Sequence, residues 1–206
     1  MKHFIFDFDG TLVDSRYLVW EYIEDRANDR KLTPEDLREY SATEVIPALG
    51  IKPWEVPQLM IQVRRAFLER LDQQPIIEGV VECFRELRKQ GHCIHVVSSN
   101  AKENIDKFLQ LHEIDDCVDR VISFFGLFGK AKILRNLMRD LQATPGDVMY
   151  IGDETRDIVA AQKAKISSLA VTWGYNSENV LAATDPSFLA RNPSEMIGIL
   201  SKRGEL

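Results

Sequence analysis

The chain has 206 residues, of which 45% are hydrophobic and 28% charged, a composition that suits one packed core with a charged surface. Its formal net charge of −6, from 32 acidic and 26 basic residues, offers no basic surface for nucleic acid. No apolar run approaches the ~18 residues of a membrane span, and the first residues do not form a signal peptide. We therefore expect a cytoplasmic protein with neither a membrane nor a nucleic-acid partner, whose oligomeric state the sequence leaves open.

Short apolar runs recur along the chain and favour strands that are buried on both faces of a sheet. Each run is too short for a helix and is rich in β-branched or aromatic residues. The predicted strands are residues 4–6, 94–97, 118–124, 148–151 and 169–171. Helical patterns lie between or after the later runs, at residues 80–90, 102–111, 131–141 and 157–164. This alternation predicts an α/β protein with a parallel sheet and helices on both of its faces.

About sixty residues after the first predicted strand contain no convincing strand. Helical patterns in this segment cover residues 17–26, 34–40 and 56–71. The strand–helix alternation resumes only near residue 75. We therefore expect a small helical domain over residues 15–74, inserted after the first strand of a core domain that comprises residues 1–14 and 75–206.

Polar residues stand where the predicted strands end or the following helix begins. In an open parallel sheet, ligands bind beyond the carboxyl ends of the strands. The candidates at this edge are Asp7, Asp9, Ser98, Ser99, Lys130 and Asp153. This combination of carboxylates, hydroxyls and a lysine is typical of a site that binds a phosphate and a metal ion. The four histidines lie elsewhere, so we expect structural roles for them.

Asp7 and Asp9 are separated by one residue at the end of a strand. Two carboxylates this close repel each other and are costly to desolvate, and Mg²⁺ would remove that cost because it prefers oxygen ligands. Gly10 lets the backbone turn sharply and present amide groups to an anion. A solvated turn is the alternative interpretation, but the apolar strand before the pair favours a functional site.

Four segments resemble the motifs of the haloacid dehalogenase superfamily of hydrolases, most closely its phosphoglycolate-phosphatase-like branch. Residues 7–15, which read DFDGTLVDS, are similar to the first motif. Residues 96–100 (VVSSN) are similar to the second, residues 129–130 (GK) to the third, and residues 151–157 (IGDETRD) to the fourth. The order is that of the family, so the resemblance covers the whole chain. It implies a Rossmann-like α/β core with a small helical cap inserted after the first strand.

The resemblance also implies a phosphatase that uses Mg²⁺ and forms an aspartyl-phosphate intermediate. Asp7 would be the nucleophile, and Asp9 would act as general acid and then as general base. The metal would be bound by Asp7, by the backbone carbonyl of Asp9 and by Asp153. Asp157, and with lower rank Glu154, would act behind these ligands by orienting a metal-bound water.

The residues that the resemblance implies for phosphate binding are Gly10, Ser98, Ser99 and Lys130. Ser98 could instead cap the helix that follows, a role for which Asn100 is a rival. Lys132 competes with Lys130, which we favour because it directly follows a glycine. A lysine at a helix N-terminus opposes the helix dipole, unless carboxylates and a phosphate face it.

The expected substrate is a small phosphorylated metabolite, such as phosphoglycolate, a sugar phosphate or a nucleoside monophosphate. A phosphomutase of the same fold is an alternative, and so is a non-catalytic interaction protein. A dehalogenase is disfavoured because that branch is expected to lack an aspartate equivalent to Asp9. The loop of residues 173–175 could line the site or simply pack against it, and the sequence does not decide between them.

Overall fold

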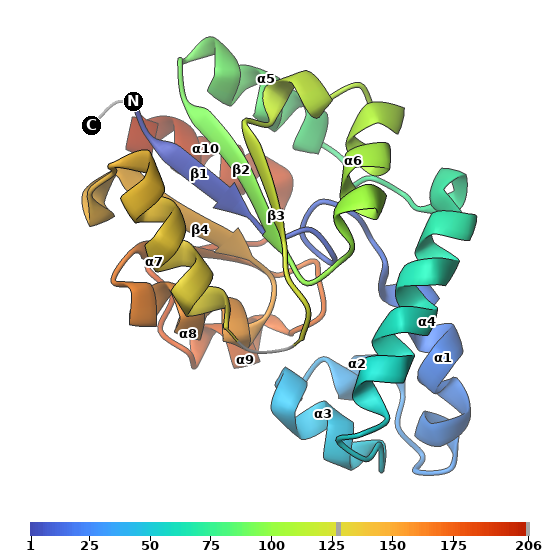
Figure 1. The fold of residues 1–206 in the computed structure, drawn as a ribbon. Coiled ribbons are helices and arrows are strands. Elements are labelled where there is room, and N and C mark those ends of the chain that lie inside the picture. Colours follow the sequence, from blue (N-terminus) through green and yellow to red (C-terminus); the bar gives the residue numbers. More distant parts are fainter. Residues whose placement is uncertain (127–128, 205–206) are drawn as a thin grey trace.

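Six parallel strands form one sheet in the order β3-β2-β1-β4-β5-β6 (Figure 1). The computed structural model describes residues 1–126 and 129–204. The strands are β1 (His3–Phe6), β2 (Cys93–Ser98), β3 (Arg120–Ser123), β4 (Val148–Gly152), β5 (Ser167–Val171) and β6 (Phe188–Ala190). The expected parallel α/β sheet is confirmed, and the strand order is that of a Rossmann-like fold. The short β6 was not predicted.

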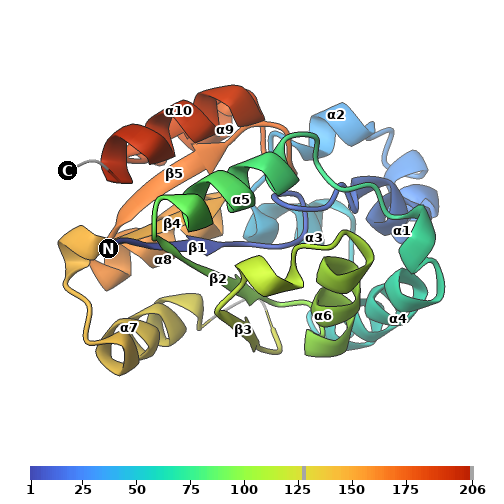
Figure 2. The ribbon, with the colours of Figure 1, turned by 90° about the horizontal axis from the view of Figure 1, so that it is seen from above.

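Helices cover both faces of the sheet (Figures 1 and 2). One layer contains α5 (Val80–Lys89), α6 (Lys102–Leu111) and α10 (Pro193–Gly204), and the other contains α7 (Lys130–Leu141), α8 (Thr155–Ala164) and α9 (Glu178–Ala182). Phe4 and Phe6 pack in the first layer and Ile5 in the second, because successive side chains of a strand alternate between faces. This double burial explains the unbroken apolar runs. Every helix in the described part of the chain falls short of what a bilayer crossing requires.

Four helices follow β1 before the chain returns to the sheet. They are α1 (Arg16–Asn28), α2 (Pro34–Leu37), α3 (Ala42–Ala48) and α4 (Val56–Glu69). They share an apolar cluster of their own, built around Ile23, Ala27, Leu49 and Ile51. In Figure 1 they lie beside the carboxyl ends of β1 and β2. The sequence did not predict α3, although Glu44 accepts a hydrogen bond from the backbone N–H of Ser41 at 2.9 Å, as in a capping box.

The two ends of this insert are attached to the core at one place. The backbone N–H of Asp14 donates to the carbonyl of Pro75 at 3.0 Å, so the outgoing and returning chain lie side by side. Near the end of α4, Phe67 packs on Phe8, with 5.6 Å between their ring centroids. The insert is therefore fixed at its root, and the segment after α2 is attached to the core as well, because the Asn176 side-chain amide donates to the Tyr40 carbonyl at 2.7 Å.

A buried pair of histidines lies toward the amino ends of β1 and β2. The rings of His3 and His95 stack with 5.4 Å between centroids, and His3 Nδ1 lies 3.1 Å from His95 Nε2. Burial lowers the pKa of both imidazoles, and the charge of His3 helps to lower that of His95 to about 4. The folded state therefore favours neutral rings, in keeping with the structural role expected for the histidines.

We expect the contribution of His95 to stability to be lost as the pH falls below 6.5, so that the parent protein becomes less stable relative to a variant without this histidine. Unfolded His95 binds a proton near pH 6.5, but the folded residue does so only near pH 4, which corresponds to about 2 kcal/mol lost between pH 7 and pH 5. Urea unfolding at both pH values, on the parent protein and on His95→Gln, measures this loss. The variant should lose about 2 kcal/mol less than the parent; equal losses would contradict the assignment.

Candidate active site

The strand order reverses beside β1, and the predicted site residues lie at this reversal. In open α/β sheets, the crevice beyond the carboxyl ends of the strands at such a point is the usual ligand site. Phe6 pairs with Val96 of β2 and with Ile151 of β4, so Asp7 lies level with the ends of both neighbouring strands. Asp153 directly follows β4. The topology therefore brings Asp7 and Asp153 to the same edge.

Lys130 joins Asp7 to Asp157. Its Nζ donates to Asp7 Oδ2 at 2.8 Å and also to Asp157 Oδ1. The lysine is only 4% exposed, and its Nζ lies 5.1 Å from the centroid of the Tyr150 ring. Burial alone would lower the pKa of Lys130, but Asp157 and Asp7 together raise it. The ammonium group therefore stays charged and holds both carboxylates in place.

Asp153 is fully buried and forms no ion pair with any residue that the structure describes. Its Oδ1 accepts a hydrogen bond from the Thr11 hydroxyl, and its Oδ2 accepts one from the backbone N–H of Tyr175, both at 2.7 Å. Burial and the nearby charges of Glu154 and Asp157 raise the pKa of Asp153 well above its usual range. A buried carboxylate in this situation is stabilised by a cation.

The carboxylates of Asp7, Asp153 and Asp157 converge on one point, with one oxygen of each within 4.8 Å of the others. When all three are ionised, their negative charges exceed the one positive charge that Lys130 brings into direct contact with the cluster. Oxygen ligands of this kind suit a hard divalent cation, so the residues fit a metal ion. The backbone at Gly10 lies against the Asp153 side chain, and only glycine fits there. Its φ is +76°, and a Cβ at this position would lie 2.2 Å from Asp153 Oδ2.

Asp9 lies next to this cluster and lines a cavity. Its Oδ1 accepts a hydrogen bond from the Ser15 hydroxyl at 2.9 Å, and the side-chain amide of Asn100 donates to both of its oxygens at 3.1 Å. Burial raises the pKa of Asp9, and these hydrogen bonds partly oppose that effect. The Tyr175 hydroxyl lies 3.0 Å from Ser15 Oγ and extends the network. The carboxyl group therefore holds a proton more readily than it would in water.

The remaining predicted residues lie at the same edge with different contacts. Ser98 ends β2, and its Oγ accepts a hydrogen bond from the backbone N–H of Asn100 at 3.0 Å; it does not cap α6, whose N-cap residue is Ala101. Ser99 lines the cavity. Glu154 forms an ion pair with Arg156 and lies outside the converging carboxylates. Lys130 is the lysine that reaches the cluster, as the sequence favoured.

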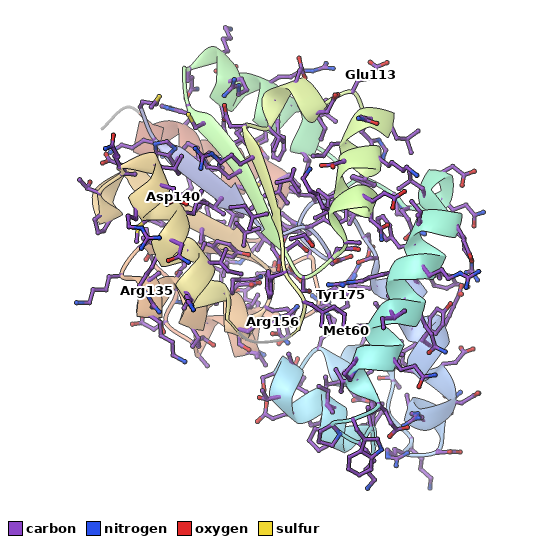
Figure 3. The ribbon with its side chains drawn as sticks, in the orientation of Figure 1. Met60, Glu113, Arg135, Asp140, Arg156 and Tyr175 are labelled. Atoms are coloured by element: carbon purple, nitrogen blue, oxygen red, sulfur yellow. The ribbon has the colours of Figure 1, made fainter. Side chains whose placement is uncertain are left out.

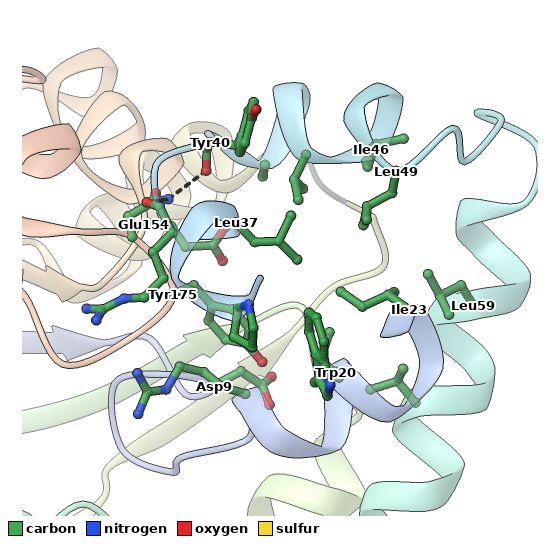
Figure 4. Close-up of a pocket in the computed structure, with 18 of the residues that line it drawn as sticks. Asp9, Trp20, Ile23, Leu37, Tyr40, Ile46, Leu49, Leu59, Glu154 and Tyr175 are labelled. Carbon is green, nitrogen blue, oxygen red and sulfur yellow. Dashed lines mark hydrogen bonds between the residues drawn. The ribbon is translucent and has the colours of Figure 1, made fainter. Parts of the chain in front are cut away.

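A cavity of about 650 Å³ separates the edge of the sheet from the insert (Figure 4). This volume is typical of small-molecule sites. Its wall on the core side consists of Asp9, Asp14, Ser99, Asn100, Glu154, Arg156, Tyr175 and Asn176. Figure 3 shows Arg156 and Tyr175 on this side of the space and Met60 of α4 across from them. The cavity therefore opens onto the candidate acid–base residue.

Sequence reasoning missed several residues that build the site, namely Thr11, Ser15, Asn100 and Arg156. All four belong to the recognised motifs or lie at their ends, and this position was the signal that could have identified them. The loop left undecided joins the site as well, because Tyr175 contacts Asp153 and the Trp173 indole N–H donates to the Thr11 carbonyl at 3.2 Å.

Known proteins resemble this chain along nearly all of its length. A family model described as haloacid dehalogenase-like hydrolase matches residues 4–171. The phosphoglycolate phosphatase of Synechococcus elongatus is 34% identical over 203 residues, which cover 96% of each chain. The pyrophosphatase PpaX of Bacillus cereus is 26% identical over 210 residues, which cover 96% of this chain and 95% of the relative.

Solved structures share the fold. A predicted phosphatase from Clostridium acetobutylicum superposes with a TM-score of 0.80 at 19% identity, over 98% of each chain. A predicted phosphoglycolate phosphatase from Haemophilus somnus gives a TM-score of 0.74 at 20% identity, over 97% of this chain and 98% of the other. The resemblance inferred from the four motifs is thus confirmed: the chain belongs to the haloacid dehalogenase-like hydrolases and is a phosphatase of that family.

Proposed function

We propose that the enzyme hydrolyses small phosphomonoesters by transferring the phosphoryl group to Asp7. The observation that carries this proposal is the buried ion-pair network in which Lys130 holds Asp7 and Asp157, with Asp153 beside them. A carboxylate fixed by an ammonium group can act as a nucleophile, because the lysine orients it and offsets the charge of an incoming phosphate. The phosphoglycolate phosphatase of Synechococcus elongatus supports a phosphomonoester as the substrate class.

The two half-reactions divide between Asp7 and Asp9. An Asp7 oxygen attacks phosphorus, the bond to the leaving oxygen breaks, and Asp9 gives that oxygen its proton. Asp9 then takes a proton from water, whose oxygen attacks the phosphorus of the aspartyl phosphate. Inorganic phosphate leaves and the Asp7 carboxylate is restored. The raised pKa of Asp9 suits the first step, because a general acid must hold its proton until the leaving oxygen needs it.

We propose Mg²⁺ as the cofactor, bound by Asp7, by the backbone carbonyl of Asp9 and by Asp153. Asp157 and Glu154 would stand behind these ligands. When bound, a divalent cation would shield the charge of the phosphate from the carboxylates that surround it. Gly10, Ser98, Ser99 and Lys130 are proposed to bind the phosphoryl oxygens.

We propose further that residues 15–74 act as a cap over a core of residues 1–14 and 75–206. The pairing of the two ends of the insert, at Asp14 and Pro75, supports this division, as do the contacts of the insert across the cavity. One such contact joins the Arg38 side chain to the Thr172 carbonyl at 2.7 Å. A cap of this kind keeps bulk water away from the reacting group.

The pyrophosphatase PpaX makes inorganic pyrophosphate a second candidate substrate. A phosphomutase would keep every site residue but return the phosphoryl group to a sugar. Phosphate release from a panel of phosphomonoesters and pyrophosphate, with and without Mg²⁺, tests the proposal. Hexose phosphates in the same panel detect a mutase, because the product would then be an isomeric hexose phosphate instead of free phosphate.

We expect Asp7→Asn to abolish turnover and keep the fold. The amide has nearly the size of the carboxylate, but it cannot attack phosphorus. Phosphate release measures activity, circular dichroism checks the fold, and mass spectrometry of the parent protein quenched during turnover should find a phosphorylated peptide that contains Asp7. More than a trace of Mg²⁺-dependent activity in the variant would exclude Asp7 as the nucleophile.

We expect Asp9→Asn to lower the first-turnover rate by roughly 10²–10⁴-fold for an alkyl phosphate, because the leaving oxygen then receives no proton. The loss should be much smaller for p-nitrophenyl phosphate, whose leaving group departs without one. Release of the alcohol or phenol in a single turnover isolates this step from hydrolysis of the intermediate. Equal losses with both substrates would show that Asp9 is not the general acid.

We expect Asp153→Asn to raise the melting temperature of the metal-free protein, because burial disfavours the charged form of this carboxyl group, which has no ion-pair partner among the described residues. Each kcal/mol gained should add about 2–4 °C. Added MgCl₂ should stabilise the parent protein but hardly change this variant. Asp157→Asn is the matched control, and it should keep more of the response to Mg²⁺. An equal response in Asp153→Asn and the parent would remove Asp153 from the metal site.

A further inference from the structure

The wall of the cavity divides into a polar part and an apolar part. Every lining residue that the described part of the core contributes bears a polar group, from Asp9 at the edge of the sheet to Asn176. Among the described residues, the apolar lining residues all lie in the insert, between positions 19 and 63, and they outnumber the polar lining residues of the insert, which are Arg16, Tyr17, Glu35, Arg38, Tyr40 and Arg64. The described core side of the wall, next to the phosphoryl chemistry, is therefore polar throughout, whereas the insert side is mainly apolar with a few polar groups.

Side chains from the four helices of the insert face one another across the apolar part (Figure 4). Trp20 and Ile23 extend from α1, and Leu59 extends from α4. Leu37 at the end of α2 and Ile46 of α3 close the opposite side. These elements surround a space that is continuous with Asp9.

Such a space is unlike an ordinary packing defect. Protein interiors have few voids larger than a water molecule, whereas this cavity measures about 650 Å³. Several of its apolar side chains, including Trp20 and Leu37, are only partly buried by the protein itself. Apolar surface that faces water costs free energy, which a bound apolar group would recover.

We propose that the leaving group of the substrate carries an apolar body, an alkyl or aryl moiety, that fills this cavity. The inference rests on the proposed function, since the phosphoryl group must sit at Asp7 for the leaving group to point past Asp9. Asp9 lies at the junction of the two parts of the wall, where the oxygen that joins phosphorus to the apolar body would lie. The substrate would thus match the wall, with its charge at the core and its hydrocarbon in the insert.

Arg156 supplies donors at the polar end of the cavity. Its Nη2 pairs with Glu154, while its Nε and Nη1 are buried and have no hydrogen-bond partner among the described residues. These nitrogens suit anionic oxygens near the core. A glycolate or a second phosphate as leaving group could use Arg156, but it would leave the apolar part of the cavity unfilled.

A series of n-alkyl phosphates from ethyl to octyl, assayed with Mg²⁺, tests the proposal directly. We expect kcat/KM to rise by about fourfold for each added methylene until the chain fills the cavity, and then to level off. Phosphoglycolate and pyrophosphate serve as polar comparisons, and both should fall at least tenfold below octyl phosphate.

Two adjacent positions of α4 provide a matched pair of variants. Met60 lines the cavity, whereas Ile61 is 57% exposed and lies outside it. Met60→Gln keeps the size of the side chain but places an amide in the apolar wall. It should lower the ratio of octyl to ethyl kcat/KM by about tenfold. Ile61→Gln should leave this ratio unchanged, and the ratio itself cancels any loss of folded enzyme.

A flat response to chain length, or faster hydrolysis of phosphoglycolate or pyrophosphate than of octyl phosphate, would overturn the inference while leaving the phosphatase activity intact. Absence of phosphate release from every compound would instead refute the proposed function. Binding separates the two cases further: octylphosphonate should bind Asp7→Asn more tightly than ethylphosphonate in calorimetry. Equal affinities would refute the apolar site whatever the turnover assays give.

Discussion

Buried negative charge at the carboxyl edge of the sheet is the constraint on which the rest of this structure depends. Asp7, Asp153 and Asp157 converge there, and the only ammonium group among them in the described structure is that of Lys130. Burying an ion costs several kcal/mol even after relaxation, and well-packed apolar residues often stabilise such a position equally well. A gain in folding stability therefore does not explain why these carboxylates are buried. The need to bind phosphate and a cation does explain it.

The fold holds these carboxylates in place before any ligand arrives. The backbone N–H of Phe8 donates to Asp7 Oδ1 at 2.9 Å, and that of Glu154 donates to Asp157 Oδ2 at 3.0 Å. Neighbouring backbone also packs so closely that a Cβ at Gly174 would lie 2.1 Å from Asp153 Oδ2. Such fixed groups need little rearrangement when charge develops during a reaction, which is the main source of electrostatic catalysis.

The sequence predicted the features of this protein that depend on local patterns. Short apolar runs identified five strands, although β3 at the edge of the sheet is not buried as expected, and the aspartates of the motifs lie at the ends of β1 and β4. Short or weakly patterned elements were not predicted. They include β6, which has three residues, and α3, whose Ser41–Glu44 capping signal was not used. The role of Asn100 in the site was not predicted for another reason. Its partner Asp9 lies 91 residues away in the sequence, and no local pattern encodes such a pairing. The apolar wall was not predicted either, because its residues come from separate helices and loops of the insert that only the fold brings together.

Asp9 lies where the two parts of the molecule meet, and its position connects selection to chemistry. On one side lies the buried cluster that would take the phosphoryl group, and on the other lies the apolar wall of the insert. Phe67 packs on Phe8 and so anchors α4 to the core. A group that fills the cavity therefore contacts a helix whose position relative to Asp9 is fixed. Binding at a distance from the reacting atoms can then align the leaving oxygen with the acid, which raises turnover as well as affinity. The insert would in this way select substrates through the rate of the chemical step and not only through the strength of binding.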